Sequence, residues 1–250
     1  MMNIIRADFY RISKSWVTYA PFAALALFHV AMMVYGSISV TGEYTSGTMY
    51  VGQLLDLAHF LFALPLIPFV FCVSVPSFSD GTMKNDISWG MSRTKLYVSK
   101  LLIMVILSIL LYVFYIGAGM GVATIVFGFG DAVPGYWMNL LQAMGAQMVG
   151  VLALCSVMIF LSFLLKKPYV LTEALAGILM IPTLINWISS LFNVDASRVL
   201  YFDLLSNIQG FASFHLLDSR TILIGFGVIA VWLLATSIAG ITLLRKAEVK

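Results

Sequence analysis

Residues 101–127 read LLIMVILSILLYVFYIGAGMGVATIVF, an apolar run that contains no charged side chain. A helix needs about 20 apolar residues to cross the hydrocarbon core of a bilayer, so this run is long enough to span a membrane. Comparable runs lie on both sides of it. Together they predict an all-α, polytopic membrane protein with six transmembrane helices, at roughly residues 17–38, 54–78, 100–127, 138–165, 169–192 and 221–244.

The composition supports this fold class. The chain has 250 residues, of which 61% are hydrophobic and 10% charged, and its mean hydropathy is +1.00. An ordinary soluble domain carries about 25% charged residues, so this chain lacks the polar groups that would cover a water-soluble surface. Six spans occupy most of residues 1–250, and we expect a single transmembrane domain.

The basic residues predict the orientation. Lys and Arg are enriched in cytoplasmic loops, and 12 of the 14 in this chain fall on one side of the predicted topology. They are Arg6, Arg11, Lys14, Lys84, Arg93, Lys95, Lys100, Lys166, Lys167, Arg245, Lys246 and Lys250, and only Arg198 and Arg220 fall on the other side. Both termini are therefore expected in the cytoplasm, and the opposite side is acidic.

Two segments outside the spans have a helical pattern. Residues 3–16 place Ile4, Ile5, Phe9 and Ile12 on one side, which predicts an interfacial helix at the N-terminus. Residues 193–220 are too apolar for a solvated loop and too interrupted to span. They predict short re-entrant helices within about 195–218 that break near Gly210 and pack against spans five and six.

The spans contain few features that suggest a site. His29 lies near the middle of span one and Glu173 near the inner end of span five, where we expect Glu173 to pair with a base such as Lys166 or Lys167. Ionisable residues within spans are candidates for function. Pro65 and Pro68 predict a bend in span two.

Residues 81–100, GTMKNDISWGMSRTKLYVSK, form a long polar passage between two apolar runs. Asp80 can cap a short helix over Gly81–Trp89, and Gly90 can end it. Ser92 can then cap span three, with Arg93, Lys95 and Lys100 at the inner headgroups. This pattern predicts a cytoplasmic amphipathic helix between spans two and three, which could lie on lipid or enter a groove on a partner protein.

The run DGTMKNDISWGMSRTKLYVSK, residues 80–100, resembles the stretch between the second and third spans of permease subunits of type-2 ABC exporters. The bacterial branch that it most resembles transports lantibiotics, bacitracin and other antimicrobial peptides, or confers immunity to them. The matching positions are Gly81, Thr82, Lys84, Asn85, Gly90, Ser92, Arg93, Tyr97 and Lys100, and the opening NIIRADFYRISKS is also similar to the family's N-terminal helix.

The resemblance implies that residues 81–91 form a coupling helix that docks on a separate ATPase. The residues implied in coupling are Gly81, Thr82, Met83, Lys84, Asn85, Ile87, Gly90, Ser92 and Arg93, with Met83 and Ile87 as the apolar contact. It also implies a permease dimer, of the same or related chains, bound to two ABC ATPase subunits. Asp86 departs from the pattern and leaves the charge of the docking face open.

The expected function is therefore the permease subunit of an ATP-driven exporter in the bacterial plasma membrane, with no nucleotide-binding domain of its own. ATP and Mg would be bound by the partner ATPase, and no cofactor, metal ligand, catalytic residue or nucleic-acid partner is expected here. The cargo would be an amphipathic or toxin-like peptide, or a lipid-like compound.

Two alternatives remain. An ion-coupled secondary transporter would be expected to carry more ionisable groups in its spans than His29 and Glu173. A membrane-embedded enzyme would require a nucleophile or metal constellation, and neither G-x-x-x-x-G-K-[ST] nor H-E-x-x-H occurs in the sequence.

Overall fold

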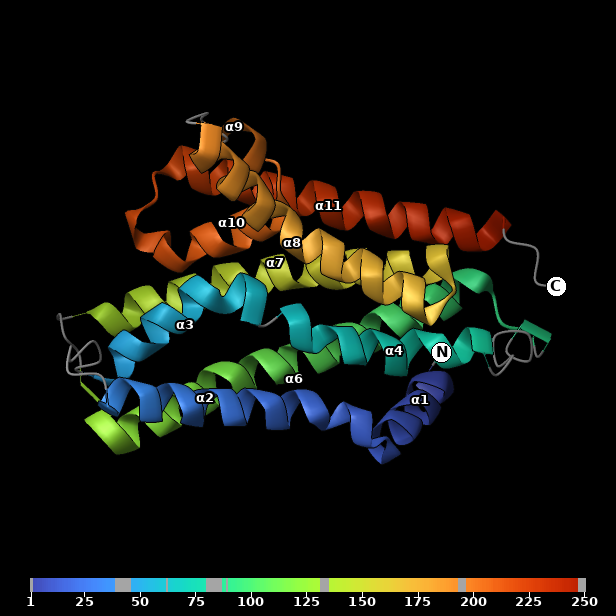
Figure 1. Ribbon diagram of the computed structural model, residues 1–250. Helices are drawn as coiled ribbons and strands as arrows, with labels where there is room; N and C mark the ends of the chain where they lie inside the picture. The colour runs from blue at the N-terminus through green and yellow to red at the C-terminus, as the bar shows by residue number, and fades with distance from the viewer. Residues whose placement is uncertain are drawn as a thin grey trace.

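The computed structural model describes residues 2–38, 46–61, 63–79, 87–88, 90–130, 135–192 and 197–246. Within these ranges the chain is helical and contains no strand. The long helices are α2 (Ala20–Ile38), α3 (Gly47–Leu61), α4 (Ala63–Ser79), α6 (Arg93–Phe127), α7 (Tyr136–Leu165), α8 (Pro168–Phe192) and α11 (Ser219–Lys246). They lie roughly lengthwise beside one another, with α1 (Met2–Lys14) angled across one end of the bundle (Figure 1).

Five helical segments of the described chain are long and apolar enough to cross a membrane, namely 16–35, α6, α7, α8 and α11. They coincide within a few residues with five of the predicted spans. The bent pair α3 and α4 gives a sixth segment of sufficient length. The expectation of an all-α chain with helices of membrane-spanning length is therefore confirmed.

The prediction for span two was wrong in its bounds and in its form. We expected one bent helix over residues 54–78, whereas α3 begins at Gly47 and α4 follows it after a break, with an angle of 60° between them. Pro65 explains the position of the break. In an unbroken helix its ring would clash with the carbonyl of Leu61, and the new helix instead places Pro65 in its first turn, where no donor is needed.

The core lies along α6 and α7. Three large tyrosines of α6, Tyr97, Tyr112 and Tyr115, are at most 1% exposed. By contrast, α8 buries a single stripe, Leu171, Leu175, Leu179 and Pro182. Large apolar side chains are exposed over the rest of α8 and much of α11, as expected of helix faces in contact with lipid.

The N-terminal helix forms as predicted. Ile12 is 1% exposed, and Ile5 and Phe9 pack against the core. Asp8 is also buried, which the apolar pattern did not indicate. A short 3-10 helix, η1 (Trp16–Thr18), turns the chain from α1 into α2.

The segment before α11 folds into short helices, as expected. These are α9 (Ser197–Leu200), α10 (Leu204–Gly210) and the 3-10 helix η2 (Phe211–Leu216), so the helix type changes at Gly210. We call residues 197–216 the outer hairpin. It packs mainly against α7 and α3, with α11 beside it and little contact with α8. The predicted packing against spans five and six is therefore found, clearly for α11 and to a small extent for α8, whereas the more extensive packing against α7 and α3 was not predicted.

Candidate functional site

Most of the predicted coupling segment lies outside the described residues. Gly81, Thr82, Met83, Lys84 and Asn85 all fall there, whereas Ile87, Gly90, Ser92 and Arg93 are described. Ile87 is half-buried and packs against the chain's own core. It therefore contributes to the fold of this chain in addition to any contact with a partner.

The residues after Ile87 form a turn and a helix start. The amide of Gly90 donates to the carbonyl of Ile87 at 3.0 Å, and Gly90 has φ of 84°, in the left-handed region that glycine adopts readily. The side chain of Ser92 accepts from the amide of Lys95 at 3.4 Å. The predicted N-cap of α6 at Ser92 is confirmed.

Arg93 joins the start of α6 to the end of α11. Its guanidinium donates to the carbonyls of Leu244 and Arg245, at 3.3 and 2.9 Å. In return, Arg245 Nε donates to Thr94 Oγ1 at 3.1 Å. The last carbonyls of a helix lack partners within it and carry partial negative charge, so a guanidinium satisfies both their hydrogen bonding and their dipole. The start of α6 and the end of α11, about 150 residues apart in the sequence, are thus joined by hydrogen bonds.

Lys100 joins α6 to α1. Its ammonium group lies 2.6 Å from Asp8 Oδ2, and the two side chains are 2% and 10% exposed. Arg11 binds the other oxygen of Asp8 at 3.0 Å and also donates to the carbonyl of Cys72 in α4 at 3.4 Å. The prediction that Lys100 lies at the headgroups was therefore wrong, because the carboxylate of α1 draws it into the protein. Asp8 and Cys72 were not foreseen as members of this group.

Tyr97, one turn before Lys100, also faces inward. It packs against Phe163 with ring centroids 5.4 Å apart. A Cβ atom at Gly240 of α11 would lie 2.4 Å from the Tyr97 ring, so α6 and α11 approach closely only because residue 240 is glycine. Tyr97, Lys100 and Arg93 together fix α6 to α1 and α11.

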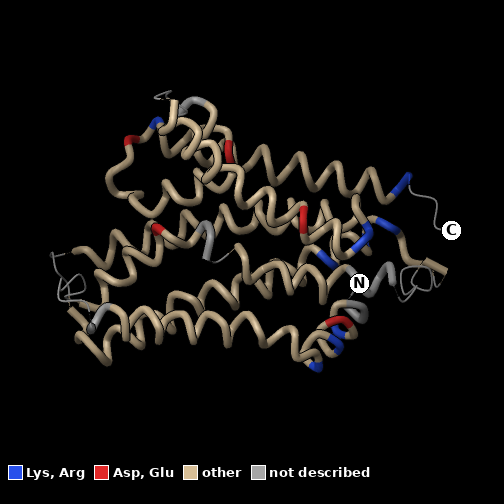
Figure 2. Tube along the Cα trace, in the orientation of Figure 1, with Lys and Arg blue, Asp and Glu red and all other residues tan. Residues whose placement is uncertain are grey.

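These contacts involve the helices that flank residues 80–92 in the sequence. This segment enters from α4 and leaves into α6, and both helices are bonded to α1 through Arg11 and Lys100. Figure 2 shows most of the described Lys and Arg residues at this end of the bundle. We call it the basic end.

His29 is the buried histidine of the interior. It is 0% exposed, and its Nδ1 lies 3.1 Å from the hydroxyl of Tyr50. Its Nε2 has no hydrogen-bond partner among the described residues. The rings of Phe28, Tyr50 and Tyr115 surround it. His29 thus bridges α2 to α3 and is shielded from the surface of the chain.

Glu173, unlike the buried His29, lies at the surface of the chain. Its side chain is exposed near the start of α8. In the described part of the chain it makes no ion pair, so the expected pairing with Lys166 or Lys167 is not formed. The two intramembrane candidates are therefore not brought together.

Gln147 of α7 forms a polar junction that the sequence did not reveal. It is fully buried, and its amide nitrogen donates to the carbonyls of Leu55 and Ile208, at 2.9 and 3.0 Å. Its amide oxygen accepts from the hydroxyl of Tyr112 at 3.1 Å. One side chain therefore connects α3, α6, α7 and α10, and both of its amide protons are used. A glutamine within an apolar run is the only signal that could have identified it.

Glycine allows the same helices to approach. A Cβ atom at Gly150 would lie 2.4 Å from Cγ1 of Ile208, so the outer hairpin rests directly on the backbone of α7. The carbonyl that Gln147 binds belongs to the same Ile208. Gly150 and Gln147, one turn apart, thus position the hairpin.

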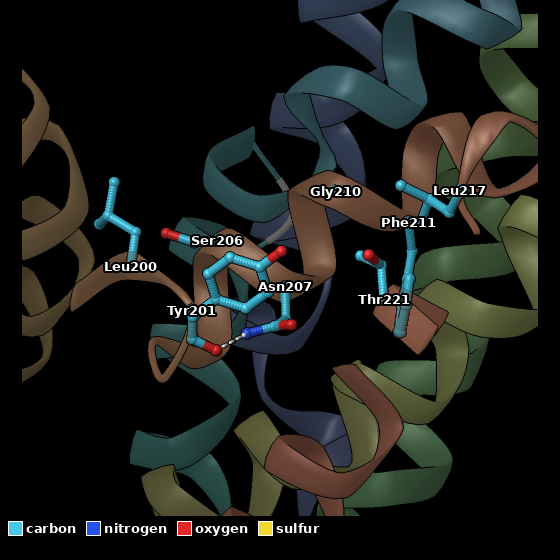
Figure 3. Close-up of a pocket in the computed structure, with 8 residues that line it drawn as sticks. All are labelled: Leu200, Tyr201, Ser206, Asn207, Gly210, Phe211, Leu217 and Thr221. Carbon is cyan, nitrogen blue, oxygen red and sulfur yellow. Dashed lines mark hydrogen bonds between the residues drawn. The ribbon is translucent and has the colours of Figure 1, made fainter. Parts of the chain in front are cut away.

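A pocket of about 300 Å³ lies between the outer hairpin and the start of α11 (Figure 3). Its lining residues are Leu200, Tyr201, Ser206, Asn207, Gly210, Phe211, Leu217 and Thr221. The amide nitrogen of Asn207 donates to the carbonyls of Tyr201 and Asp203, at 2.9 and 2.7 Å. Those bonds hold the hairpin together, and the rest of the pocket lining is mainly apolar, with hydroxyl groups from Ser206 and Thr221.

The described residues contain no group of three His, Cys, Asp or Glu side chains that could hold a metal ion. Apart from His29 Nε2, the polar side chains of the interior described above bond to backbone carbonyls and to one another. Their geometry is that of helix junctions, and the charged junctions lie at the basic end.

Residues 16–249 match the family model DUF2705, described as a protein family of unknown function, and the chain belongs to this family. No curated protein matches the chain.

Proposed function

We propose that this chain is the permease subunit of an ATP-driven exporter of the type-2 ABC class, which carries cargo through the bacterial plasma membrane with a separate ATPase as its motor. Both termini would lie in the cytoplasm, and the permease would act as a dimer of the same or related chains. The cargo would be an amphipathic or antimicrobial peptide, or a lipid-like compound.

The observation that carries this proposal is the bonding around residues 80–92. A motor that pushes on this segment must transmit its movement to the spans. Lys100 and Arg11 tie both flanking helices to α1, and Arg93 ties α6 to α11. Movement of the segment would therefore be shared by these helices.

The charges at the other end support a cationic cargo. The sequence predicts six acidic residues on that side, against Arg198 and Arg220, and among them Asp56 and Asp218 are exposed and Asp203 is half-exposed. A surface with an excess of one sign attracts ligands of the other sign.

The experiment first asks whether the gene beside this chain's gene encodes an ABC ATPase. The ATPase found is then co-expressed with the chain, and co-purification and ATP-driven transport in proteoliposomes are measured. Met83→Asp removes one apolar contact of the coupling segment while avoiding the half-buried Ile87. Burying a methionine side chain contributes about 1.5–3 kcal/mol, so the ATPase should bind at least about tenfold more weakly.

Met138→Asp is the matched control. Met138 is exposed in the first turn of α7, at the end of the bundle away from the basic end. This variant should retain the ATPase. Undiminished binding of the ATPase by Met83→Asp would refute the coupling role, and transport driven by a proton gradient without ATP would favour a secondary transporter.

A further inference from the structure

A hollow of about 570 Å³ opens between the ends of α7 and α11 at the basic end. Phe160, Leu164 and Lys166 line it from α7 and the residue after it, and Ala239, Thr242, Leu243 and Lys246 line it from α11. We call it the α7–α11 hollow.

The hollow has a basic part at the helix ends and an apolar part deeper between the helices. Lys166 and Lys246 lie at the helix ends, whereas Phe160 and Ala239 lie six and seven residues deeper. At 1.5 Å per residue the apolar part therefore extends about 10 Å from the lysines. The Thr242 hydroxyl in the wall already donates to the carbonyl of Ala239, at 2.9 Å.

The two lysines are available to a ligand. Both side chains are exposed, and neither forms an ion pair with any described residue. Lys166 has φ of 58°, a left-handed conformation at the C-terminus of α7. Glycine is the usual residue at such a position because it adopts this conformation at no steric cost. A lysine there places a charge beside the hollow despite that cost.

We propose that the α7–α11 hollow binds an anionic phospholipid of the leaflet at the basic end. The phosphate lies between the ammonium groups of Lys166 and Lys246, and an acyl chain follows the apolar wall towards Phe160 and Ala239. Paired positive charges complement a headgroup with net negative charge, and basic pockets between membrane helices are known to bind such headgroups. A soluble anion would use the lysines and leave the apolar wall uncovered.

The first test is lipid binding by the purified chain, measured by native mass spectrometry. The chain is titrated with phosphatidylglycerol and phosphatidylcholine that have identical acyl chains. Each lysine near an anionic lipid surface contributes about a fivefold factor (about 1 kcal/mol), so Lys166→Gln with Lys246→Gln should weaken phosphatidylglycerol binding about 25-fold. Binding of phosphatidylcholine should remain weak and unchanged.

Lys14→Gln with Lys95→Gln is the matched control, because it removes the same charge from exposed lysines outside the hollow. It should weaken phosphatidylglycerol binding less than twofold. Equal weakening in the two double variants would show diffuse surface attraction and overturn the proposal. So would equal affinity of the unchanged chain for the two lipids.

The second test concerns the acyl chain. Ala239→Leu fills the hollow and retains both lysines, whereas Ala235→Leu adds the same volume on an exposed face outside it. Ala239→Leu should lower the affinity for phosphatidylglycerol about tenfold, and Ala235→Leu should leave it unchanged. If Ala239→Leu leaves phosphatidylglycerol binding unchanged, no acyl chain occupies the hollow and the proposal is overturned.

Discussion

The basic end and the interior of the bundle are held together by different kinds of bond. At the basic end, Lys100 binds Asp8 and Arg93 binds the carbonyls of α11, so each junction includes a full charge. In the interior, Gln147 binds the carbonyls of Leu55 and Ile208 through neutral groups.

The difference predicts which parts can separate. Removing one partner of a buried ion pair costs about 3–5 kcal/mol because the other charge stays buried. A neutral hydrogen bond between membrane helices contributes on average about 0.6 kcal/mol, with a maximum of about 1.7. The basic end should therefore move as a unit, while the outer hairpin can leave α7 at a lower cost.

The strongest test of this contrast is Lys100→Met. It leaves Asp8 buried with only the partly exposed Arg11 as a partner. We expect a loss of about 3–5 kcal/mol in the free energy of unfolding, measured in detergent micelles. Lys95→Met, an exposed lysine on the same helix, should change it by less than about 0.5 kcal/mol.

Adding Asp8→Asn to Lys100→Met should recover part of the loss, because no buried charge then remains. If Lys100→Met and Lys95→Met proved equally mild, the ion pair would not be the main bond between α1 and α6.

The second test is Gln147→Leu, which removes three neutral hydrogen bonds from the interior. At an average of about 0.6 kcal/mol per bond, the loss in the free energy of unfolding should be about 2 kcal/mol. It should destabilise the outer hairpin more than the rest of the chain. Hydrogen exchange should accelerate in residues 204–216 and not in α1. Gln142→Leu, an exposed glutamine of α7, provides the control. Uniform acceleration across the chain would mean that Gln147 supports the whole fold.

The third test separates close approach from hydrogen bonding. Gly150→Ala places a methyl group against Ile208 and should destabilise the chain by about 1–3 kcal/mol. Gly145→Ala, where nothing lies within 4 Å, should be neutral or slightly stabilising. Combining Gly150→Ala with Ile208→Ala removes the clashing atoms. We expect the double variant to lose less free energy of unfolding than the two single variants lose together. An additive loss would mean that the packing of Ile208 on Gly150 does not explain the effect.

The sequence predicts the spans well because each depends on a local property. A run such as 101–127 can be recognised without knowledge of its neighbours. The N-cap at Ser92 and the apolar face of α1 are local in the same sense. The early start of α3 was missed because Gly47, Thr48 and Gln53 lower the hydropathy of a segment that is buried by other helices.

The junctions could not be predicted because their partners are distant in the sequence. Lys100 lies 92 residues from Asp8, and without the structure it resembles the other lysines near a membrane surface. Gln147 binds two backbone carbonyls, and every residue has one. The bend at Pro65 was foreseen, but the packing of the outer hairpin beside α3 depends on the three-dimensional path of the broken span.

The smallest expected effect lies at the start of α11, outside the spans and away from both kinds of junction. The pKa of Asp218 is lowered, first because the Thr221 hydroxyl donates to its carboxylate and also because amides at the helix start do so. The unfolded carboxyl group has a pKa of about 3.9. Because the folded value is lower, the charged group stabilises the fold above about pH 4, and this contribution is lost as the pH falls through the folded pKa.

Asp218→Asn should isolate this charge, since asparagine can still cap a helix. The thermal midpoint of the variant should be slightly below that of the unchanged chain at pH 7, and the gap should narrow as the pH falls below about 4. Calorimetry in detergent at several pH values would measure the difference between the two thermal midpoints. A gap of constant size from pH 7 to pH 3 would assign the difference to the shape of the cap. A narrowing gap shows that charge also contributes at this end of the molecule, though weakly, because the carboxylate is exposed to solvent and Lys100 and Asp8 are not.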